Sequence, residues 1–190
     1  MKTDIVFPSG NEEKLAKSGK ELGFERLIFV YSAVSDVKKI SSSVEIKYGV
    51  LVKEKNKNKL NKLIDQIRSK GFLVLVEASE DDYNRFVLER TKAEMIFGLE
   101  MSGKRDKMHY RRSGLDQVLC KITKEKGKII AFNFKKILDK VVLGRMIQNL
   151  RFCRKYKVKT LLGSFASKPE EMKSSSDLSS FLHLLEQKFL

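Results

Sequence analysis

The sequence is poor in the residues that build most metal and redox sites. Its 190 residues include two histidines, two cysteines, two prolines and no tryptophan. Cys120 and Cys153 form no CxxC motif, so neither a zinc ribbon nor a redox pair is indicated, and we expect buried, reduced thiols. With only His109 and His183 available, a hydrolase that holds several metal ions through a set of histidines is strongly disfavoured.

Long apolar runs and linkers are also missing. No stretch approaches the roughly 20 apolar residues that span a bilayer. The first residues, MKTDIVFPSG, lack the charged and apolar regions of a signal peptide, so we expect a cytoplasmic protein with no membrane partner. Because no Gly- or Ser-rich linker divides the chain, we expect residues 1–190 to form a single domain.

Acidic residues are the minority charge. There are 24 Asp and Glu against 39 Lys and Arg, a formal net charge of +15. A charged, solvated surface of the kind found in thermophiles would be closer to balance, because it is rich in Lys and Glu together. The excess opposes self-association and attracts polyanions, so it favours nucleic acid or a nucleoprotein as the partner.

Short apolar runs rich in β-branched residues recur along the chain and predict about seven strands. They lie at 4–7, 26–31, 45–52, 72–78, 95–100, 128–134 and 160–166. Several are continuous rather than alternating, which is typical of parallel strands buried on both faces.

Helical patterns separate most of these strands. Leu60, Leu63, Ile64 and Ile67 follow the spacing of one helix face, and a glycine stands at three helix-to-strand junctions. Residues 32–43 have room for little more than one helical turn. Alternating strands and helices predict an α/β fold with a parallel sheet, either an incomplete (β/α) barrel or a doubly wound sheet.

No catalytic motif appears where either fold would place an active site. GxxxxGK[ST], GxGxxG, GxSxG and HExxH are all absent. Asp4, Glu77, Glu100 and Asp106 are candidates for a carboxylate Mg²⁺ site, although pairing with the abundant Lys and Arg is the preferred explanation. We therefore predict no catalytic residues and no metal ligands.

Two segments resemble one known family. Residues 109–134, HYRRSGLDQVLCKITKEKGKIIAFNF, and residues 145–185, with RMIQNLRFCRKYKVKTLLGSFAS followed by an MKS turn, are similar to ribonuclease P protein component 3 of archaea and eukaryotes. The resemblance is strong in the C-terminal half and covers the N-terminal half only in outline. The chain departs from it at Phe165, where the family pattern reads Ser-Gly-Ala, and at Asp116, where Asn is commoner.

This resemblance carries specific implications. It implies a single-domain, TIM-like (β/α) barrel related to the polymerase-and-histidinol-phosphatase barrel but without its metal ligands. It implies a subunit of ribonuclease P that assists the catalytic RNA in removing 5′ leaders from precursor tRNA. Its partners would be ribonuclease P RNA, precursor tRNA, protein component 2 in a heterotetramer and the other protein subunits. The protein would bind no cofactor, and Mg²⁺ would serve the RNA.

The first group of candidate binding residues surrounds the helix expected after Ser113, which we predict to be its N-cap. Leu115, Val118, Leu119 and Ile122 should face the core, which leaves Gln117, Lys121 and Lys124 outside. Just before this helix, Arg111 and Arg112 lie where a helix N-terminus favours anions. An ion pair with Asp106 or Glu100 is the alternative. His109 is a further possible contact, or a packed histidine.

The second group lies on the next long helix. Arg151, Arg154 and Lys155 share a face beside its apolar seam, and Arg145 precedes them. Arginine binds phosphate oxygens with two parallel hydrogen bonds, so these arginines rank above scattered lysines as RNA or partner contacts. The Lys-rich stretch 53–62 is interpreted as a flexible, generic basic surface.

Three functions therefore remain open at the level of sequence. The preferred one is the non-catalytic ribonuclease P subunit. A free-standing, Mg²⁺-dependent barrel phosphoesterase is the second, and a generic RNA-binding scaffold is the third.

Overall fold

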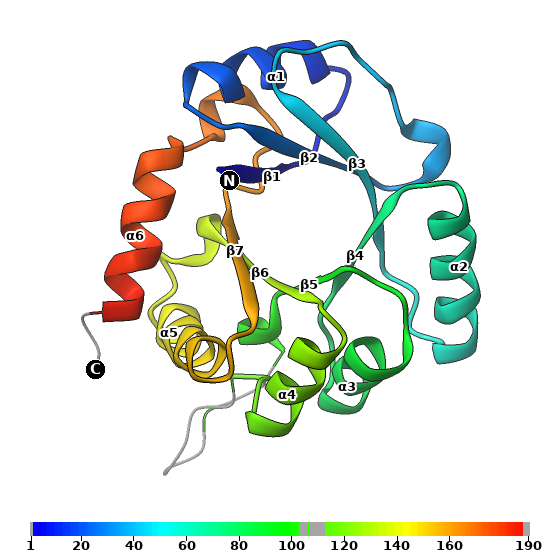
Figure 1. Cartoon of the computed structure of the whole chain (residues 1–190), viewed down its shortest axis with the longest axis vertical. Helices are drawn as coiled ribbons and strands as arrows, with labels where there is room; N and C mark the ends of the chain where they lie inside the picture. The colour runs from blue at the N-terminus through cyan, green and yellow to red at the C-terminus, as the bar shows by residue number, and fades with distance from the viewer. Residues whose placement is uncertain (1, 103–105, 107–112, 188–190) are drawn as a thin grey trace.

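Seven parallel strands, side by side in the order of the sequence, form the centre of the molecule. The computed structural model describes residues 2–102, 106 and 113–187. The strands are β1 (Thr3–Val6), β2 (Arg26–Tyr31), β3 (Glu45–Val52), β4 (Leu73–Glu77), β5 (Met95–Phe97), β6 (Ile129–Asn133) and β7 (Lys159–Gly163). A bridge between Val6 and Ala166 joins the first strand to the last, so the sheet closes into a barrel (Figure 1). The barrel prediction is confirmed over the doubly wound sheet.

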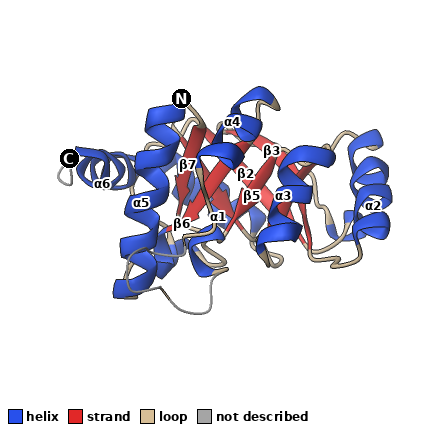
Figure 2. Ribbon diagram, turned by 90° about the horizontal axis from the view of Figure 1, so that it is seen from below, coloured by secondary structure: helices blue, strands red, loops and turns tan. Residues whose placement is uncertain are grey.

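In the part of the chain that the structure describes, α-helices surround the barrel (Figure 2). They are α1 (Glu12–Glu21), α2 (Lys57–Ser69), α3 (Asp81–Arg90), α4 (Gln117–Glu125), α5 (Lys140–Tyr156) and α6 (Ser175–Gln187). The connection between β2 and β3 holds only a 3-10 turn, Val34–Asp36, as the sequence predicted. Within the described residues, no helix is both long enough and apolar enough to cross a membrane.

Alternate residues of each strand pack on opposite sides of the sheet. In β2, Leu27 and Phe29 belong to the core between sheet and helices, whereas Ile28 and Val30 belong to a second core inside the barrel. Both sides are buried, which explains why the strand sequences are continuously apolar. The three glycines predicted to end helices, Gly23, Gly71 and Gly127, have φ of 79°, 82° and 65°. Glycine accepts this left-handed conformation without the steric cost of a Cβ.

Closure of the barrel depends on a side chain. The buried Asp4 carboxylate of β1 accepts hydrogen bonds from the backbone N–H and the hydroxyl of Ser164, both at 2.6 Å. It also accepts the N–H of Ile5 at 2.8 Å. Burial raises the pKa of Asp4 to about 6, and the hydrogen bonds from Ser164 and Ile5 oppose this rise. Asp4 therefore completes the β1–β7 seam instead of binding a ligand.

Two local predictions around α4 are wrong. Ser113 is buried and does not cap the helix, because Gly114, with φ of 75°, and Leu115 intervene before it begins. Asp116 is the N-cap instead, and its Oδ1 accepts the N–H of Leu119 at 2.8 Å. Val118 is 47% exposed, since the helix turns Leu119, Cys120 and Thr123 inward.

The basic stretch 53–62 is also more ordered than predicted. Residues from Lys57 onward belong to α2, and Asn56 caps this helix by accepting the N–H groups of Asn58 and Lys59. The N-cap supplies an acceptor to two otherwise free donors, which is why the helix begins inside this Lys-rich run.

Candidate nucleic-acid interface

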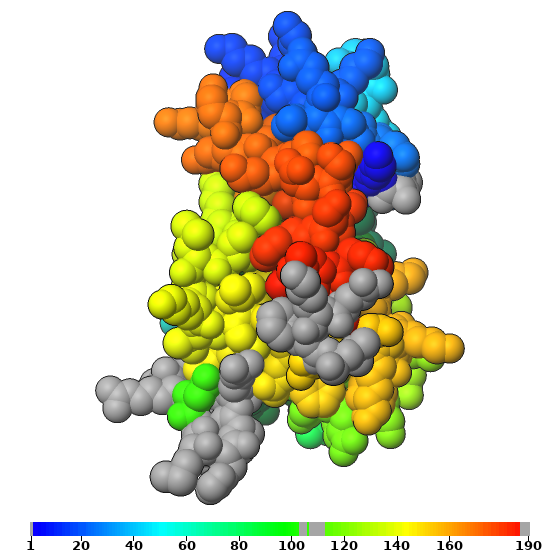
Figure 3. Space-filling model, turned by 90° about the vertical axis from the view of Figure 1, so that its left-hand side faces the viewer, coloured from blue at the N-terminus to red at the C-terminus, as the bar shows by residue number. Residues whose placement is uncertain are grey.

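The last two turns of α5 carry three exposed cations. Arg151, Arg154 and Lys155 follow the buried Leu150 and flank the buried Cys153, so they lie on the solvent side of the helix. Arg154 donates a hydrogen bond from Nη1 to the Glu186 carbonyl of α6 at 3.0 Å, which fixes its guanidinium between the two helices. Figure 3 shows α5 (yellow) beside α6 (red) on one face of the molecule.

The neighbouring helix α4 carries the other predicted lysines. Lys121 and Lys124 are exposed, as is Gln117. The hydroxyl of Tyr156 donates to Gln117 Oε1 at 3.2 Å, so the end of α5 is tied to the start of α4. The structure therefore presents both predicted cation groups on adjacent helices.

Three further lysines belong to this basic surface and were missed from the sequence. Lys126 ends α4, Lys157 ends α5 with φ of 55°, and Lys159 begins β7; all three are exposed. Because β6 and β7 are parallel neighbours and each follows one of these helices, the three lysines lie at the same end of the barrel. We call Lys121, Lys124, Lys126, Arg151, Arg154, Lys155, Lys157 and Lys159 the α4–α5 basic surface. The sequence contained a sign of these lysines, because both helices end in basic residues just before a strand. The dipole of a helix favours cations at its C-terminus.

These cations are largely uncompensated. Within residues 2–102, 106 and 113–187, no ion pair joins any member of the α4–α5 basic surface to a carboxylate. Some cations elsewhere have acidic partners, such as Arg26 with Glu45 at 2.7 Å and Lys135 with Glu171 at 2.6 Å, whereas others, such as Lys70, have none among the described residues. Uncompensated cations on two adjacent helices suit a polyanion.

Arg145 does not lie on this surface, contrary to our expectation of an RNA or partner contact. Its side chain is 4% exposed, and Nε donates to the Asp106 carboxylate at 2.8 Å. A second bond runs from Nη1 to the Glu100 carbonyl at 3.3 Å. The apolar seam of α5 faces inward at this turn, so the arginine binds the chain segment that covers it.

Asn149 repeats this role one turn further along α5. It is buried, and its Nδ2 donates to the carbonyl of Ser113 at 2.8 Å. Arg145 and Asn149 thus bind residues on both sides of positions 107–112. Three predicted contacts, His109, Arg111 and Arg112, fall outside the described residues, so their predicted roles stay predictions.

Glu100 is the unusual group in this neighbourhood. Its carboxylate is fully buried, and neither oxygen has a hydrogen-bond partner among the described residues. Burial raises the pKa of Glu100 to about 7, because the charged form loses its hydration. The alternative considered from the sequence, an ion pair of Glu100 with Arg111 or Arg112, involves arginines outside the described residues and stays a prediction.

At the carboxyl ends of β1, β5 and β7, the end of the barrel where barrel enzymes place their active sites, three aromatic rings pack together. Phe7 follows β1, Phe97 ends β5 and Phe165 follows β7. The Phe165 ring lies 5.8 Å from that of Phe7 and 5.1 Å from that of Phe97. Phe165 holds its position with φ of 52°, in the region that favours glycine.

Three of the four carboxylates considered for Mg²⁺ have other partners, and the fourth, Glu100, is buried without a hydrogen-bond partner among the described residues. Asp4 bonds to Ser164, Glu77 pairs with Lys53 at 3.1 Å, and Asp106 pairs with Arg145. The described part of the chain contains no cluster of three or more His, Cys, Asp or Glu side chains suited to a metal ion. Cys120 and Cys153, predicted to be buried free thiols, are both buried and free.

Fold and surface together define a class: a seven-stranded (β/α) barrel with aromatic rings at its mouth and cations on its outer helices.

No family model matches the sequence. It is similar to ribonuclease P protein component 3 from Methanococcus maripaludis, 28% identical over 141 residues that cover 71% of this chain and 58% of the relative. The ribonuclease P protein component 3 from Methanocaldococcus jannaschii is 27% identical over 158 residues, which cover 79% of this chain and 65% of the relative. The chain is a homologue of these archaeal proteins, as the sequence motifs predicted, and spans about three-fifths of their length.

Solved structures show the same fold. A chain of archaeal ribonuclease P, determined with mature tRNA, has a TM-score of 0.75 and 20% identity, covering 96% of this chain and 82% of that one. A histidinol phosphate phosphatase from Lactococcus lactis, determined with zinc, L-histidinol and phosphate, has a TM-score of 0.67 and 15% identity, covering 95% and 92%. The predicted relation to the histidinol-phosphatase barrel is confirmed at the level of the fold.

Proposed function

We propose that the chain is a protein subunit of ribonuclease P that assists the catalytic RNA in removing 5′ leaders from precursor tRNA. The observation that carries the proposal is its similarity, over 71% and 79% of its length, to archaeal proteins named ribonuclease P protein component 3. The uncompensated cations of the α4–α5 basic surface support it. Hydrolysis belongs to the RNA and its Mg²⁺ ions, and the protein binds no cofactor.

The physical contribution of the protein is charge neutralisation. A folded catalytic RNA brings phosphates close together, and their repulsion must be offset by Mg²⁺ or by protein cations. Arg151 and Arg154 offer planar forks for phosphate oxygens, whereas the lysines of the α4–α5 basic surface act as point charges. The protein should therefore lower the Mg²⁺ concentration at which the RNA becomes active.

The proposed partners follow from the same relationship. They are ribonuclease P RNA, precursor tRNA, protein component 2 in a two-plus-two heterotetramer, and the other protein subunits. Such a particle works where precursor tRNA is made, so we propose a cytoplasmic location. His109, Arg111 and Arg112 remain proposed contacts beside the α4–α5 basic surface.

A free-standing, Mg²⁺-dependent phosphoesterase is the competing proposal. The packing of Phe7, Phe97 and Phe165 weighs against it, because these rings occupy the end of the barrel where substrate and metal would enter. A generic RNA-binding scaffold would use the same cations but would not depend on protein component 2.

Reconstitution separates these functions. Ribonuclease P RNA and protein component 2 are assembled with or without this chain, and precursor-tRNA cleavage is followed across a range of Mg²⁺ concentrations. The proposal expects a large gain at low Mg²⁺ and a smaller one at high Mg²⁺. If adding this chain increased precursor-tRNA cleavage at no Mg²⁺ concentration, the result would contradict the proposal and favour a generic RNA-binding scaffold.

A further inference from the structure

The helix layer around the barrel has one gap. Every other connection between consecutive strands contains an α-helix, of 9 residues in α4 and 17 in α5 at the extremes. Between β2 and β3 there is only the turn Val34–Asp36. The outer side of β3 next to α2 therefore lacks the helix that covers the equivalent place elsewhere (Figure 1).

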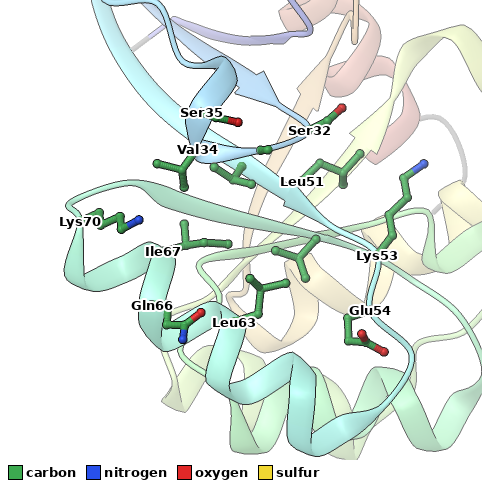
Figure 4. A pocket seen from close by; sticks show the side chains of 13 residues that line it. Ser32, Val34, Ser35, Leu51, Lys53, Glu54, Leu63, Gln66, Ile67 and Lys70 are labelled. Atoms are coloured by element: carbon green, nitrogen blue, oxygen red, sulfur yellow. The ribbon is translucent and has the colours of Figure 1, made fainter.

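A groove of about 640 Å³ occupies this gap. Val50 and Val52 of β3, which we call its floor, line the groove, and Figure 4 shows Leu63 and Ile67 of α2 on one side and Val34 on the other. The floor and Ile67 are buried, but Leu63 is 38% exposed, although it lies on the helix face that meets the groove. The groove, which we call the β3–α2 groove, thus has an apolar interior open to solvent.

Cations lie at both ends of the β3–α2 groove. Figure 4 shows Lys70 at one end and Lys53 at the other, and Glu54 supplies the acidic side chain of the lining. Lys53 pairs with Glu77 at 3.1 Å, whereas Lys70 has no ion pair within the described residues. Among the charged lining residues, Lys70 is therefore the cation without an acidic neighbour in the described chain, and an occupant with acidic side chains at that end would complement it.

We propose that the β3–α2 groove binds one amphipathic helix of a partner protein, with apolar side chains at i, i+3, i+4 and i+7 and acidic residues beside them. Such a helix would complete the outer layer and cover Leu63, as in other helix-in-groove complexes. Nucleic acid does not suit an apolar floor, because its phosphates would lose hydration without finding cations inside. A second copy of this chain is disfavoured by a net charge of +15 on each copy.

This inference goes beyond the proposed function and does not depend on it, so it is tested without RNA. The probe is a labelled synthetic peptide of about 14 residues with four leucines at helical spacing and glutamates on both sides, bound to the full-length protein and followed by fluorescence anisotropy. Two control peptides are used, one with the same residues in scrambled order and one with lysine in place of glutamate. A single-stranded oligoribonucleotide serves as competitor.

We expect the acidic helical peptide to bind more tightly than both controls. Leu63→Lys should weaken binding at least about tenfold, because it puts a charge into the apolar contact. Val118→Lys, on the exposed face of α4, adds the same charge at a residue of similar exposure and should leave binding unchanged. Lys70→Glu should weaken binding about threefold at low salt.

Three results would overturn the inference: equal binding of the scrambled peptide, no effect of Leu63→Lys, or displacement of the peptide by the oligonucleotide. Thiol labelling gives a second measurement. In Leu63→Cys the new thiol is exposed while Cys120 and Cys153 are buried, so the peptide should slow its alkylation about tenfold or more. Concentration-dependent dimerisation that protects this thiol without peptide would instead identify a second copy as the occupant and contradict the proposal.

Discussion

The ring of Phe165 lies 5.1 Å from the ring of Phe97, across the carboxyl ends of β7 and β5. Phe165 adopts φ of 52° to reach this position, a conformation that costs most residues about 1 kcal/mol relative to glycine. Glycine would adopt this backbone conformation without that cost, whereas the side chain of Phe165 packs against the rings of Phe7 and Phe97.

Replacing Phe165 separates the stabilisation by its ring contacts from the cost of its backbone conformation. Phe165→Ala should lower the free energy of unfolding by about 3–4 kcal/mol, because the ring contacts are lost while the backbone strain stays. Phe165→Gly loses the same contacts but relieves the strain, so it should be more stable than Phe165→Ala by about 1 kcal/mol. Denaturant unfolding of both variants measures the difference. An alanine variant as stable as the glycine variant would show that the backbone is not strained.

Loss of two surface arginines should affect processing in a Mg²⁺-dependent way. Arg151→Ala with Arg154→Ala removes two phosphate-binding forks, so precursor-tRNA cleavage by the reconstituted particle should fall more at low Mg²⁺ than at high Mg²⁺. Because Arg151 is exposed and lacks a carboxylate partner in the described chain, Arg151→Ala alone should change stability by no more than about 0.5 kcal/mol. Equal loss of activity at all Mg²⁺ concentrations would argue against charge neutralisation.

Arg145 should behave in the opposite way. Arg145→Ala removes the buried guanidinium that donates to the Asp106 carboxylate and the Glu100 carbonyl, and should cost about 1.5–3 kcal/mol of stability. Arg145→Lys keeps the charge but not the paired donors, and should recover only part of that loss. Thermal unfolding of the two variants beside Arg151→Ala makes the comparison. If Arg145→Ala were as stable as wild type, the buried ion pair would have no structural role.

The lysines at the helix ends should appear in the salt dependence of RNA binding. Lys124→Gln, Lys126→Gln and Lys159→Gln together remove three charges from the α4–α5 basic surface but leave Lys157 with its unusual φ in place. If each contacts one phosphate, the slope of log K against log salt should become shallower by about 2 to 3. Lys14→Gln, Lys17→Gln and Lys20→Gln on α1 provide a matched control with the same loss of charge. An equal change in slope for the control would point to general attraction without a defined surface.

Glu100 should make stability depend on pH. Its pKa is about 7 in the folded protein against an ordinary value of 4.5, so the folded state binds this proton more tightly than the unfolded state. The free energy of unfolding should therefore fall as pH rises from about 4.5 to 7, and Glu100 should add no slope above that. Glu100→Gln should remove this slope and raise stability at pH 8 by about 1–3 kcal/mol.

Chemical denaturation of wild type and Glu100→Gln at pH 5 and pH 8 measures this effect. The Asp4 carboxyl, with a pKa of about 6, contributes a slope of the same sign in both proteins and so cancels in the comparison. A Glu100→Gln variant less stable than wild type at pH 8 would mean that the carboxylate is charged and well bound.

Pattern and spacing predicted the alternating strands and helices but not the position of each charge. Continuous apolar strands such as 26–31 and glycines such as Gly71 follow from local chemistry, whereas the choice of a barrel over a doubly wound sheet came from the family resemblance. Burial of a cation depends on contacts far along the chain. From its local sequence Arg145 is expected at the surface, and its burial follows from the ion pair with Asp106. Lys128 is buried because its Nζ donates to the carbonyls of Thr91 and Ala93 at 2.8 and 2.7 Å.

The position of the α4 cap shows a similar limit. Ser113 and Asp116 both have side chains that cap helices well, and the sequence prediction chose Ser113. The choice depends on Asn149, which binds the carbonyl of Ser113, and on the close packing of Gly114 against Leu99. Both partners lie at least a dozen residues away, beyond the reach of local patterns.

The central claim is that this cationic barrel serves an RNA that carries out the hydrolysis. The most direct measurement is cleavage of precursor tRNA by three mixtures: the purified protein with Mg²⁺, the RNA with protein component 2, and the complete set. We expect no cleavage by the protein alone, and a higher rate of 5′-leader removal by the complete set than by the mixture that lacks this chain. Phosphodiester cleavage by the purified protein, without any RNA subunit, would contradict the account.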